Sequence, residues 1–177
     1  MRILLTGASG TGKSTLVEKF IKEHPEYERS FNFVRNMHSF LNFPLNEDVT
    51  NESQYAINAF MAYQIINKEN LISDRSIVDS LIWTKVAPNI SKKQYKKHKK
   101  DFLPVLDKID TLHFYVPIEF EMEEDRHRSS DEKYRRKIDK SIKKLLDKNH
   151  IFYETLTGTV EERYAQMLEA IEAQSIF

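Results

Sequence analysis

The chain has 177 residues, a length typical of one domain with a sizeable hydrophobic core. It carries 27 lysines and arginines against 27 aspartates and glutamates, and this balance removes any overall attraction to nucleic acid or to an anionic membrane. Cysteine is absent, which excludes disulfides, a thiol nucleophile and metal sites with cysteine ligands.

The N-terminal residues and the overall hydropathy favour the cytoplasm. Residues 1–5 run directly into a glycine-containing segment, so we expect no signal peptide. No window approaches the roughly 18 uninterrupted apolar residues of a membrane-spanning helix. We therefore expect a cytoplasmic protein that has no membrane partner.

The first predicted elements are a short strand over residues 3–5 and a helix over 13–23, joined by a glycine-rich loop. Residues 7–14 match G-x-x-x-x-G-K-[ST], the pattern of a phosphate-binding loop or P-loop. In such a loop the backbone N–H groups and the N-terminal end of the helix surround an anion. We assign nucleotide binding to Gly7, Ala8, Ser9, Gly10, Thr11, Gly12, Lys13, Ser14 and Thr15. Lys13 is further expected to reach the β- and γ-phosphates as a catalytic cation, and Ser14 to offer its hydroxyl to Mg²⁺.

A second strand is predicted over residues 27–34, followed by a short helix over 35–41. Arg35 directly follows this strand. Ligands of parallel sheets lie at the carboxyl ends of the strands, so we expect Arg35 to bind substrate. Residues 52–69 are predicted to form a helix with Ala56, Ala59, Phe60, Tyr63 and Ile66 on one face.

Charged residues follow the third predicted strand, residues 71–74. The Asp74 carboxylate is expected to be catalytic, either by organising Mg²⁺ or by accepting a proton from a hydroxyl. Arg75 is expected to bind a substrate phosphate. The alternative makes Asp74 a helix cap and Arg75 a surface cation. Ser76 and Asp79 form the capping-box pattern at the start of a helix over 76–86.

A helix over residues 91–108 is predicted next, with Tyr95, Phe102 and Leu106 facing the core. Seven lysines and no acidic residue occupy positions 85–100. Their spacing is that of the solvated face of an amphipathic helix, and few aromatic residues are interleaved with them. A lysine patch of this kind could contact nucleic acid, but its spacing and the few aromatic residues favour a solvated helix face, so nucleic acid is not the expected partner.

A strand over residues 111–116, stopped by Pro117, leads into a charged segment without apolar periodicity. We predict a lid over approximately residues 118–136. Arg126 and Arg128 are expected to be catalytic cations over a transferring phosphoryl group, and Arg135 to bind substrate beside them. The alternative is an ordinary solvated loop.

The C-terminal part contains a predicted helix over 131–148, a strand over 151–153 and a helix over 159–174. Gly158 and Thr159 lie at the turn before the last helix, on the ligand side of the sheet. We assign both residues to nucleotide binding, because a glycine there allows the backbone to lie against a base. The alternative is that Gly158 is a left-handed turn residue.

Strands and helices alternate along the chain, which is the pattern of a parallel sheet with helices on both faces. The predicted fold class is α/β: a three-layer P-loop NTPase fold with about five parallel strands and a charged lid. No repeat or linker interrupts the alternation, so residues 1–177 are predicted to form a single domain.

Four segments in chain order, 7–15, 74–76, 124–135 and 156–163, resemble the small P-loop kinases of nucleosides and nucleotides. The resemblance is to the AAA-labelled group that includes nicotinamide riboside kinase domains and phage-type nucleotide kinases. It implies ATP and Mg²⁺ at the P-loop, with Ser14 and Asp74 near the metal, lid arginines, and an adenine-side loop at Gly158 and Thr159. Residues 30–35 lack the acidic residue that such kinases often have after their second strand. Its absence favours a phosphate-binding Arg35 and a monophosphate acceptor.

The sequence thus predicts an enzyme that uses ATP and Mg²⁺ to phosphorylate a nucleoside monophosphate or a nucleoside. A nicotinamide riboside kinase or another metabolite kinase is the alternative within this class. A P-loop ATPase or NTPase switch that acts on a macromolecule is the alternative from another class. The expected partner is the small-molecule acceptor, and assembly into a homodimer is left open.

Overall fold

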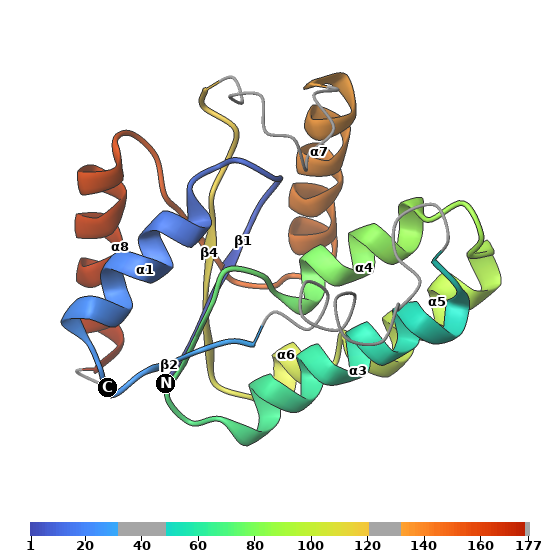
Figure 1. The fold of residues 1–177 in the computed structure, drawn as a ribbon, viewed down its shortest axis with the longest axis horizontal. Coiled ribbons are helices and arrows are strands. Elements are labelled where there is room, and N and C mark those ends of the chain that lie inside the picture. Colours follow the sequence, from blue (N-terminus) through green and yellow to red (C-terminus); the bar gives the residue numbers. More distant parts are fainter. Residues whose placement is uncertain (32–48, 121–131, 176–177) are drawn as a thin grey trace.

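The structure is a computed structural model that describes residues 1–31, 49–120 and 132–175 (Figure 1). Arg35 and the predicted helix over 35–41 lie outside the described residues. Arg126 and Arg128, within the predicted lid, also lie outside them. The roles assigned to these three arginines stay predictions.

The described residues contain a parallel sheet of five strands: β1 (Arg2–Thr6), β2 (Glu28–Arg29), β3 (Leu71–Ser73), β4 (Thr111–Tyr115) and β5 (Glu154–Thr155). Their order is β2-β3-β1-β4-β5, which places β1 at the centre. β1 pairs with β4 over its whole length and with β3 on its other side. The carboxyl ends of the strands therefore meet at one edge of the sheet. The prediction of about five parallel strands is confirmed.

Helices cover both faces of the sheet, which confirms the predicted three-layer arrangement (Figure 1). α1 (Lys13–Glu23) and α8 (Val160–Ser175) lie on one face. The other face is covered by α3 (Asn51–Asn67), α4 (Ile77–Val86), α5 (Lys92–Phe102), α6 (Val105–Lys108) and α7 (Glu132–Lys148). None of the helices within the described ranges has both the length and the hydropathy that crossing a bilayer requires.

Strand β1 separates two apolar clusters. Leu4 packs with side chains of α3, α4 and α7, whereas Ile3 and Leu5 pack on the opposite face with side chains of α1 and α8. Successive residues of a strand point to opposite faces, and a strand covered on both faces is continuously apolar for that reason. The core therefore fixes the end of β1, where the P-loop begins.

The starts and ends of several helices follow local sequence signals. The Ser76 hydroxyl accepts a hydrogen bond from the backbone of Val78, and the Asp79 carboxylate accepts one from the Ser76 N–H at 2.9 Å, which confirms the predicted capping box. The helix predicted over 91–108 is divided into α5 and α6 at Leu103 and Pro104. Proline has no N–H to donate, so it favours the end of one helix and the start of the next.

The apolar residues that the sequence places on one face of α3 do not mark its buried face, although Ala59 packs against the core. Tyr63 is 58% exposed and Ile66 is 46% exposed, whereas Gln64 and Asn58 are buried. The buried amides are satisfied: Gln64 accepts from the Phe31 N–H at 2.6 Å, and Asn58 donates to the Thr84 hydroxyl at 3.1 Å. A count of apolar residues misplaces the face because polar side chains with fixed partners occupy it.

The last strand also differs from the prediction. β5 comprises Glu154 and Thr155, which pair with Phe114 and Tyr115 of β4, and residues 151–153 form no strand. The apolar character of residues 151–153 is explained differently: Ile151 and Tyr153 pack against the core, while Phe152 is 74% exposed. Similarly, the strand predicted over 27–34 is limited to Glu28–Arg29 within the described residues.

His113, in the middle of β4, is a polar side chain buried without a partner. It is 2% exposed, and neither ring nitrogen makes a hydrogen bond to any described residue. Burial lowers the pKa of His113 to about 4, and the charge of Asp79 offsets only part of this effect. The folded protein therefore holds this imidazole in its neutral form at pH 7.

We expect His113 to make the stability of the protein depend on pH between 6.5 and 4. Above this range the imidazole is neutral in both the folded and the unfolded chain. Below pH 6.5 only the unfolded chain binds the proton readily, so the free energy of unfolding falls, by about 3 kcal/mol at pH 4. Urea unfolding of His113→Leu over this range should show a correspondingly smaller loss than the wild type.

The matched control is His150→Asn, because His150 is exposed and its φ of 52° is one that asparagine tolerates. This variant should retain the wild-type pH profile. An unchanged profile in His113→Leu would show that the buried imidazole does not cause the pH dependence.

Candidate functional site

The P-loop connects the end of β1 to the start of α1 and has a backbone that only glycine fits at two points. Gly7 has a φ of 154°, and a Cβ at this position would overlap the carbonyl oxygen of Val116, which follows β4. Gly12, the residue before α1, has a φ of 89°, and no side chain caps the N-terminus of this helix. The uncapped N-terminal amides of α1 thus remain available to an anion.

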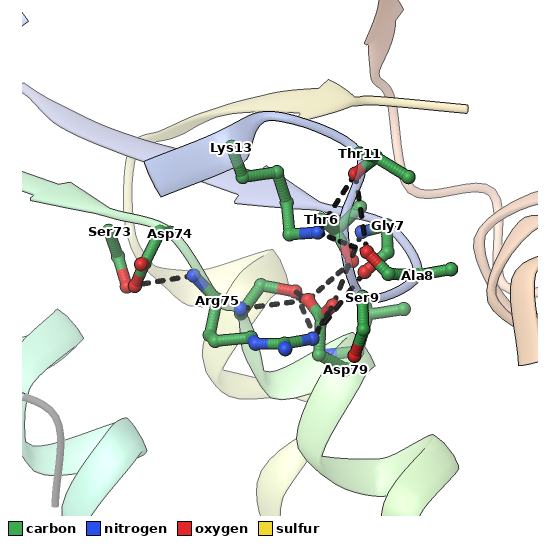
Figure 2. Close-up of polar contacts among 12 residues, drawn as sticks. Thr6, Gly7, Ala8, Ser9, Thr11, Lys13, Ser73, Asp74, Arg75 and Asp79 are labelled. Carbon is green, nitrogen blue, oxygen red and sulfur yellow. Dashed lines mark hydrogen bonds and ion pairs between the residues drawn. The ribbon is translucent and has the colours of Figure 1, made fainter. Parts of the chain in front are cut away.

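Cationic side chains donate hydrogen bonds to the backbone carbonyl oxygens in the first part of the P-loop (Figure 2). Arg75, after β3, donates from Nη1 to the Gly7 carbonyl at 3.5 Å. Lys13 donates from Nζ to the Ala8 carbonyl at 2.5 Å and to the Thr11 hydroxyl at 3.0 Å. The two side chains come from different elements, so the loop is tied to both β3 and α1.

Two buried arginines donate hydrogen bonds to the next three carbonyl oxygens of the loop, those of Ser9, Gly10 and Thr11. Arg135 of α7 donates from Nε to Ser9 at 2.8 Å and from Nη2 to Gly10 at 3.1 Å. Arg163 of α8 donates from Nη1 to Thr11 at 2.7 Å. These residues are 5% and 2% exposed respectively. α7 and α8 lie on opposite faces of the sheet, so the loop is held from both sides.

The backbone N–H groups of the P-loop, unlike its carbonyl groups, have few hydrogen-bond partners among the described residues. Within the described part of the chain, the backbone N–H groups of Ser9, Gly10, Thr11 and Gly12 donate to no residue. Successive free N–H groups beside a helix N-terminus form an anion-binding concavity. The loop therefore has the hydrogen-bonding capacity to bind a phosphate chain, as its sequence predicts.

Asp74 lies beside the start of α1. Its Oδ2 accepts from the Ser14 hydroxyl at 2.8 Å and from Arg29 Nη2 at 3.3 Å. Burial by itself would raise the pKa of Asp74, but the Ser14 hydrogen bond and the charges of Arg29 and Arg75 outweigh it, and the pKa is lowered. Asp74 is thus ionised at neutral pH, and it is joined to the residue expected to bind metal.

The Ser14 and Asp74 oxygens fit Mg²⁺ but do not form a complete metal site. Mg²⁺ prefers hard oxygen ligands, and a hydroxyl next to an ionised carboxylate supplies them. Among the described residues no cluster of three or more histidine, aspartate or glutamate side chains is placed to hold a metal ion. Protein sites of this kind bind Mg²⁺ together with the phosphates of a nucleotide, and Ser14 and Asp74 would hold the protein side of such an ion.

Asp79 has a larger role than the capping box that its sequence position predicts. It is 1% exposed, and its Oδ2 also accepts from the Thr6 hydroxyl at 2.5 Å. Its Oδ1 accepts from the Gly7 N–H at 3.2 Å and from Arg75 Nη1 at 3.4 Å (Figure 2). One carboxylate therefore joins the end of β1, the first residue of the P-loop and the start of α4.

Asp139 of α7 is a further acidic group beside the P-loop. Its Oδ2 accepts from the Tyr115 hydroxyl at 2.8 Å. Burial raises the pKa of Asp139, and the Tyr115 hydrogen bond, the charges of Lys13 and Arg135 and the backbone of Ala8 offset only part of the increase. This group therefore ionises at a higher pH than an ordinary aspartate does.

Gly158 and Thr159 lie at the turn between β5 and α8. Gly158 has a φ of 92°, in the left-handed region that favours glycine, so it is a left-handed turn residue. The Gly158 N–H donates to Glu119 Oε2 at 2.8 Å. Contact with a base stays a prediction for both residues.

The structure thus brings together Lys13, Ser14, Asp74, Arg75 and Arg135 from the predicted site residues. Sequence reasoning missed the site roles of Arg29, Asp79, Glu119, Asp139 and Arg163. Asp79 carried a signal, its place three residues after Ser76, and that signal pointed to a cap; Glu119 lies within the predicted lid and Arg163 within the segment 156–163, but neither was given a role of its own. The other residues act through contacts between segments that lie apart in sequence, such as the bond between Arg163 and Thr11, which are 152 positions apart.

The sequence matches the AAA domain family over residues 2–163. The chain belongs to this family. The sequence has no significant match among curated proteins.

Solved structures share the fold of this AAA domain. A NadR protein in complex with NAD and AMP-PNP has a TM-score of 0.73 at 15% identity, covering 97% of this chain and 48% of that one. The deoxyadenosine kinase from M. mycoides has a TM-score of 0.67 at 18% identity, covering 98% and 99%. The thymidylate kinase from Candida albicans has a TM-score of 0.68 at 17% identity, covering 98% and 91%. The chain spans about half the length of the NadR protein. The shared property at these identities is the small P-loop kinase fold.

Asp79→Asn should destabilise the AAA domain and weaken its phosphate site. An amide in this position directs its NH₂ group at other donors, so the free energy of unfolding should fall by about 3 kcal/mol. Affinity for inorganic pyrophosphate should fall at least about tenfold, because Gly7 loses its anchor. Denaturant unfolding and calorimetry measure the two effects. Asp107→Asn, at an exposed position of α6, should change neither quantity. Wild-type stability in Asp79→Asn would contradict the anchoring role.

Proposed function

We propose that this AAA domain is a P-loop phosphotransferase that uses ATP and Mg²⁺ to phosphorylate a nucleoside monophosphate or a nucleoside. The observation that carries the proposal is the division of the P-loop peptide groups: the carbonyls are bonded to cationic side chains, and four successive N–H groups are left for an anion. The Ser14–Asp74 pair lies next to this loop. A cytoplasmic location accompanies the proposal, since ATP is available there.

The reaction forms a bond between an acceptor oxygen and the γ-phosphorus and breaks the bond to the bridging oxygen, so that ADP leaves. Mg²⁺, bound with the nucleotide, would neutralise charge on the phosphates. The chain's own part is to orient the polyphosphate on the P-loop amides and to hold its negative charge with Lys13. Arg126 and Arg128 are proposed to add positive charge from the lid, and Gly158 and Thr159 to contact the base.

Asp74 suits metal organisation better than general base catalysis. A general base works best when its pKa lies near the operating pH, whereas interactions with Ser14, Arg29 and Arg75 lower the pKa of Asp74. We therefore assign Asp74 to orienting Ser14 and the hydrated metal. The acceptor proton is then left to solvent or to the transferred phosphoryl group.

The acceptor side of the site carries positive charge. Arg29, in β2, pairs with Asp74 and with Glu18 and is partly exposed. Arg75, with a side chain 35% exposed, lies beside it after β3. Two guanidinium groups next to the transfer site favour an acceptor that carries a phosphate, as does the proposed role of Arg35. A monophosphate is accordingly our first choice and a nucleoside our second.

A riboside kinase is the second candidate function, because the fold is also shared with a NadR protein in complex with NR, at a TM-score of 0.74 and 14% identity, covering 97% of this chain and 50% of that one. In contrast, a P-loop switch would respond to a macromolecule instead of a small acceptor. ADP release, measured with Mg·ATP and a panel of nucleosides and nucleoside monophosphates that includes nicotinamide riboside, separates these candidates. We expect ADP release to rise at least about tenfold with one monophosphate or nucleoside. Uniform basal rates across the panel would contradict the kinase proposal.

Lys13→Ala should abolish phosphoryl transfer without unfolding the protein. The ammonium group lies within the P-loop, where it donates to the Ala8 carbonyl and the Thr11 hydroxyl, so its loss should lower kcat/KM at least about 100-fold. Coupled ADP assays and circular dichroism check the two parts of this expectation. Lys22→Ala, at an exposed position of the same helix, serves as the control. Normal turnover by Lys13→Ala would remove the P-loop from the mechanism.

A further inference from the structure

The loop of residues 157–159 is held by two side chains of α8, Gln166 and Glu162. Gln166 accepts from the Thr157 N–H at 3.1 Å and donates to the Thr157 carbonyl at 3.0 Å. Glu162 accepts from the Thr159 N–H at 2.7 Å, and the Thr159 hydroxyl accepts from the Glu162 N–H at 3.2 Å, the reciprocal bonds of a capping box. A short exposed loop with this many fixed backbone groups has one well-defined position.

Glu119 joins this loop to the rest of the site. It follows β4, and its Oε2 accepts from both the Gly158 N–H at 2.8 Å and Arg163 Nη2 at 2.6 Å. Burial by itself would raise the pKa of Glu119, but these two hydrogen bonds outweigh it and the pKa is lowered. Glu119 is therefore a carboxylate at neutral pH, and both of its bonds are charge-assisted.

Arg163 completes the connection to the P-loop. Its guanidinium donates to Glu119 and, from Nη1, to the Thr11 carbonyl at 2.7 Å. The Phe120 ring centroid lies 5.4 Å from the guanidinium carbon, so an aromatic side chain covers the cation. A planar guanidinium donates in two fixed directions, and the distance between its two acceptors is therefore fixed as well.

We propose that Arg163 and Glu119 are positioning residues that set the distance between the P-loop and the loop of residues 157–159. This inference rests on the proposed function, in which the P-loop binds the polyphosphate and the second loop contacts the base. A nucleotide is bound at both ends only when the two loops stand at the right separation. The Arg163–Glu119 bridge accordingly adds base-dependent affinity to the affinity for the phosphate chain.

Calorimetric titrations with two probes test the bridge. Mg·tripolyphosphate reports on the P-loop alone, and Mg·ATP reports on the P-loop and the second loop together. In Glu119→Gln the dissociation constant for ATP should rise at least about tenfold, whereas that for tripolyphosphate should stay within about twofold of the wild type. In Arg163→Lys both constants should rise, because one ammonium group cannot reproduce the two directed bonds.

Two matched variants control for charge and side-chain size. Glu161→Gln removes an exposed carboxylate from the first turn of α8, and Arg136→Lys replaces an exposed guanidinium of α7 that pairs with Glu132. Both should bind the two probes as the wild type does. Gln166→Ala provides a second test that leaves Arg163 and Glu119 in place. It releases Thr157 and should also weaken ATP binding without affecting tripolyphosphate.

The outcomes separate the inference from the proposed function. An equal loss of both probes in Glu119→Gln and Gln166→Ala, or no loss of either, overturns the inference while the wild type still binds ATP. If a thermal melt shows that Glu119→Gln is not folded, Gln166→Ala provides the test instead. The deciding quantity is again the ratio of the dissociation constants for ATP and tripolyphosphate. A wild-type protein that binds neither probe refutes the proposed function itself.

Discussion

The rest of the site depends on one constraint: the carbonyl oxygens of the P-loop are held by cationic side chains, which leaves its N–H groups directed at an anion. From Gly7 to Thr11 the carbonyl oxygens accept hydrogen bonds from Arg75, Lys13, Arg135 and Arg163. A peptide group whose carbonyl is held cannot rotate freely, so the direction of its neighbouring N–H group is set as well. The amides are thus preorganised, and binding an anion requires little rearrangement of the loop.

The arginines that hold the loop are matched by opposite charge in the interior, although the Nε of Arg163 is buried without a hydrogen-bond partner among the described residues. A buried guanidinium is costly unless its donors and its charge are matched. Arg135 has carbonyl acceptors and the Glu132 carboxylate at 3.0 Å, and Arg163 has the Thr11 carbonyl and Glu119. Removing one partner would leave a charge buried alone. This dependence makes the loop, the start of α7 and the start of α8 parts of one polar network around the sheet edge.

Three aspartates around the loop differ because their surroundings differ. Asp79 is buried and saturated with donors, so it acts as an anchor between β1 and α4. Asp74 is held ionised by Ser14 and two arginines, which suits contact with a hydrated metal ion. Burial raises the pKa of Asp139, which packs beside the P-loop and accepts a hydrogen bond from Tyr115. The three carboxylates therefore lie at a single sheet edge in three different environments.

The sequence by itself determined the P-loop, the alternation of strands and helices, the parallel sheet and the capping box at Ser76. These features depend on neighbours a few residues apart or on a repeated apolar pattern, which can be read along the chain. Only the tertiary structure decided the buried face of α3, the residues of β5, and the contacts of Asp139, Glu119 and Arg163. Those depend on which segments meet in space, and a pairing such as Arg163 with Thr11, 152 positions apart, leaves no local pattern.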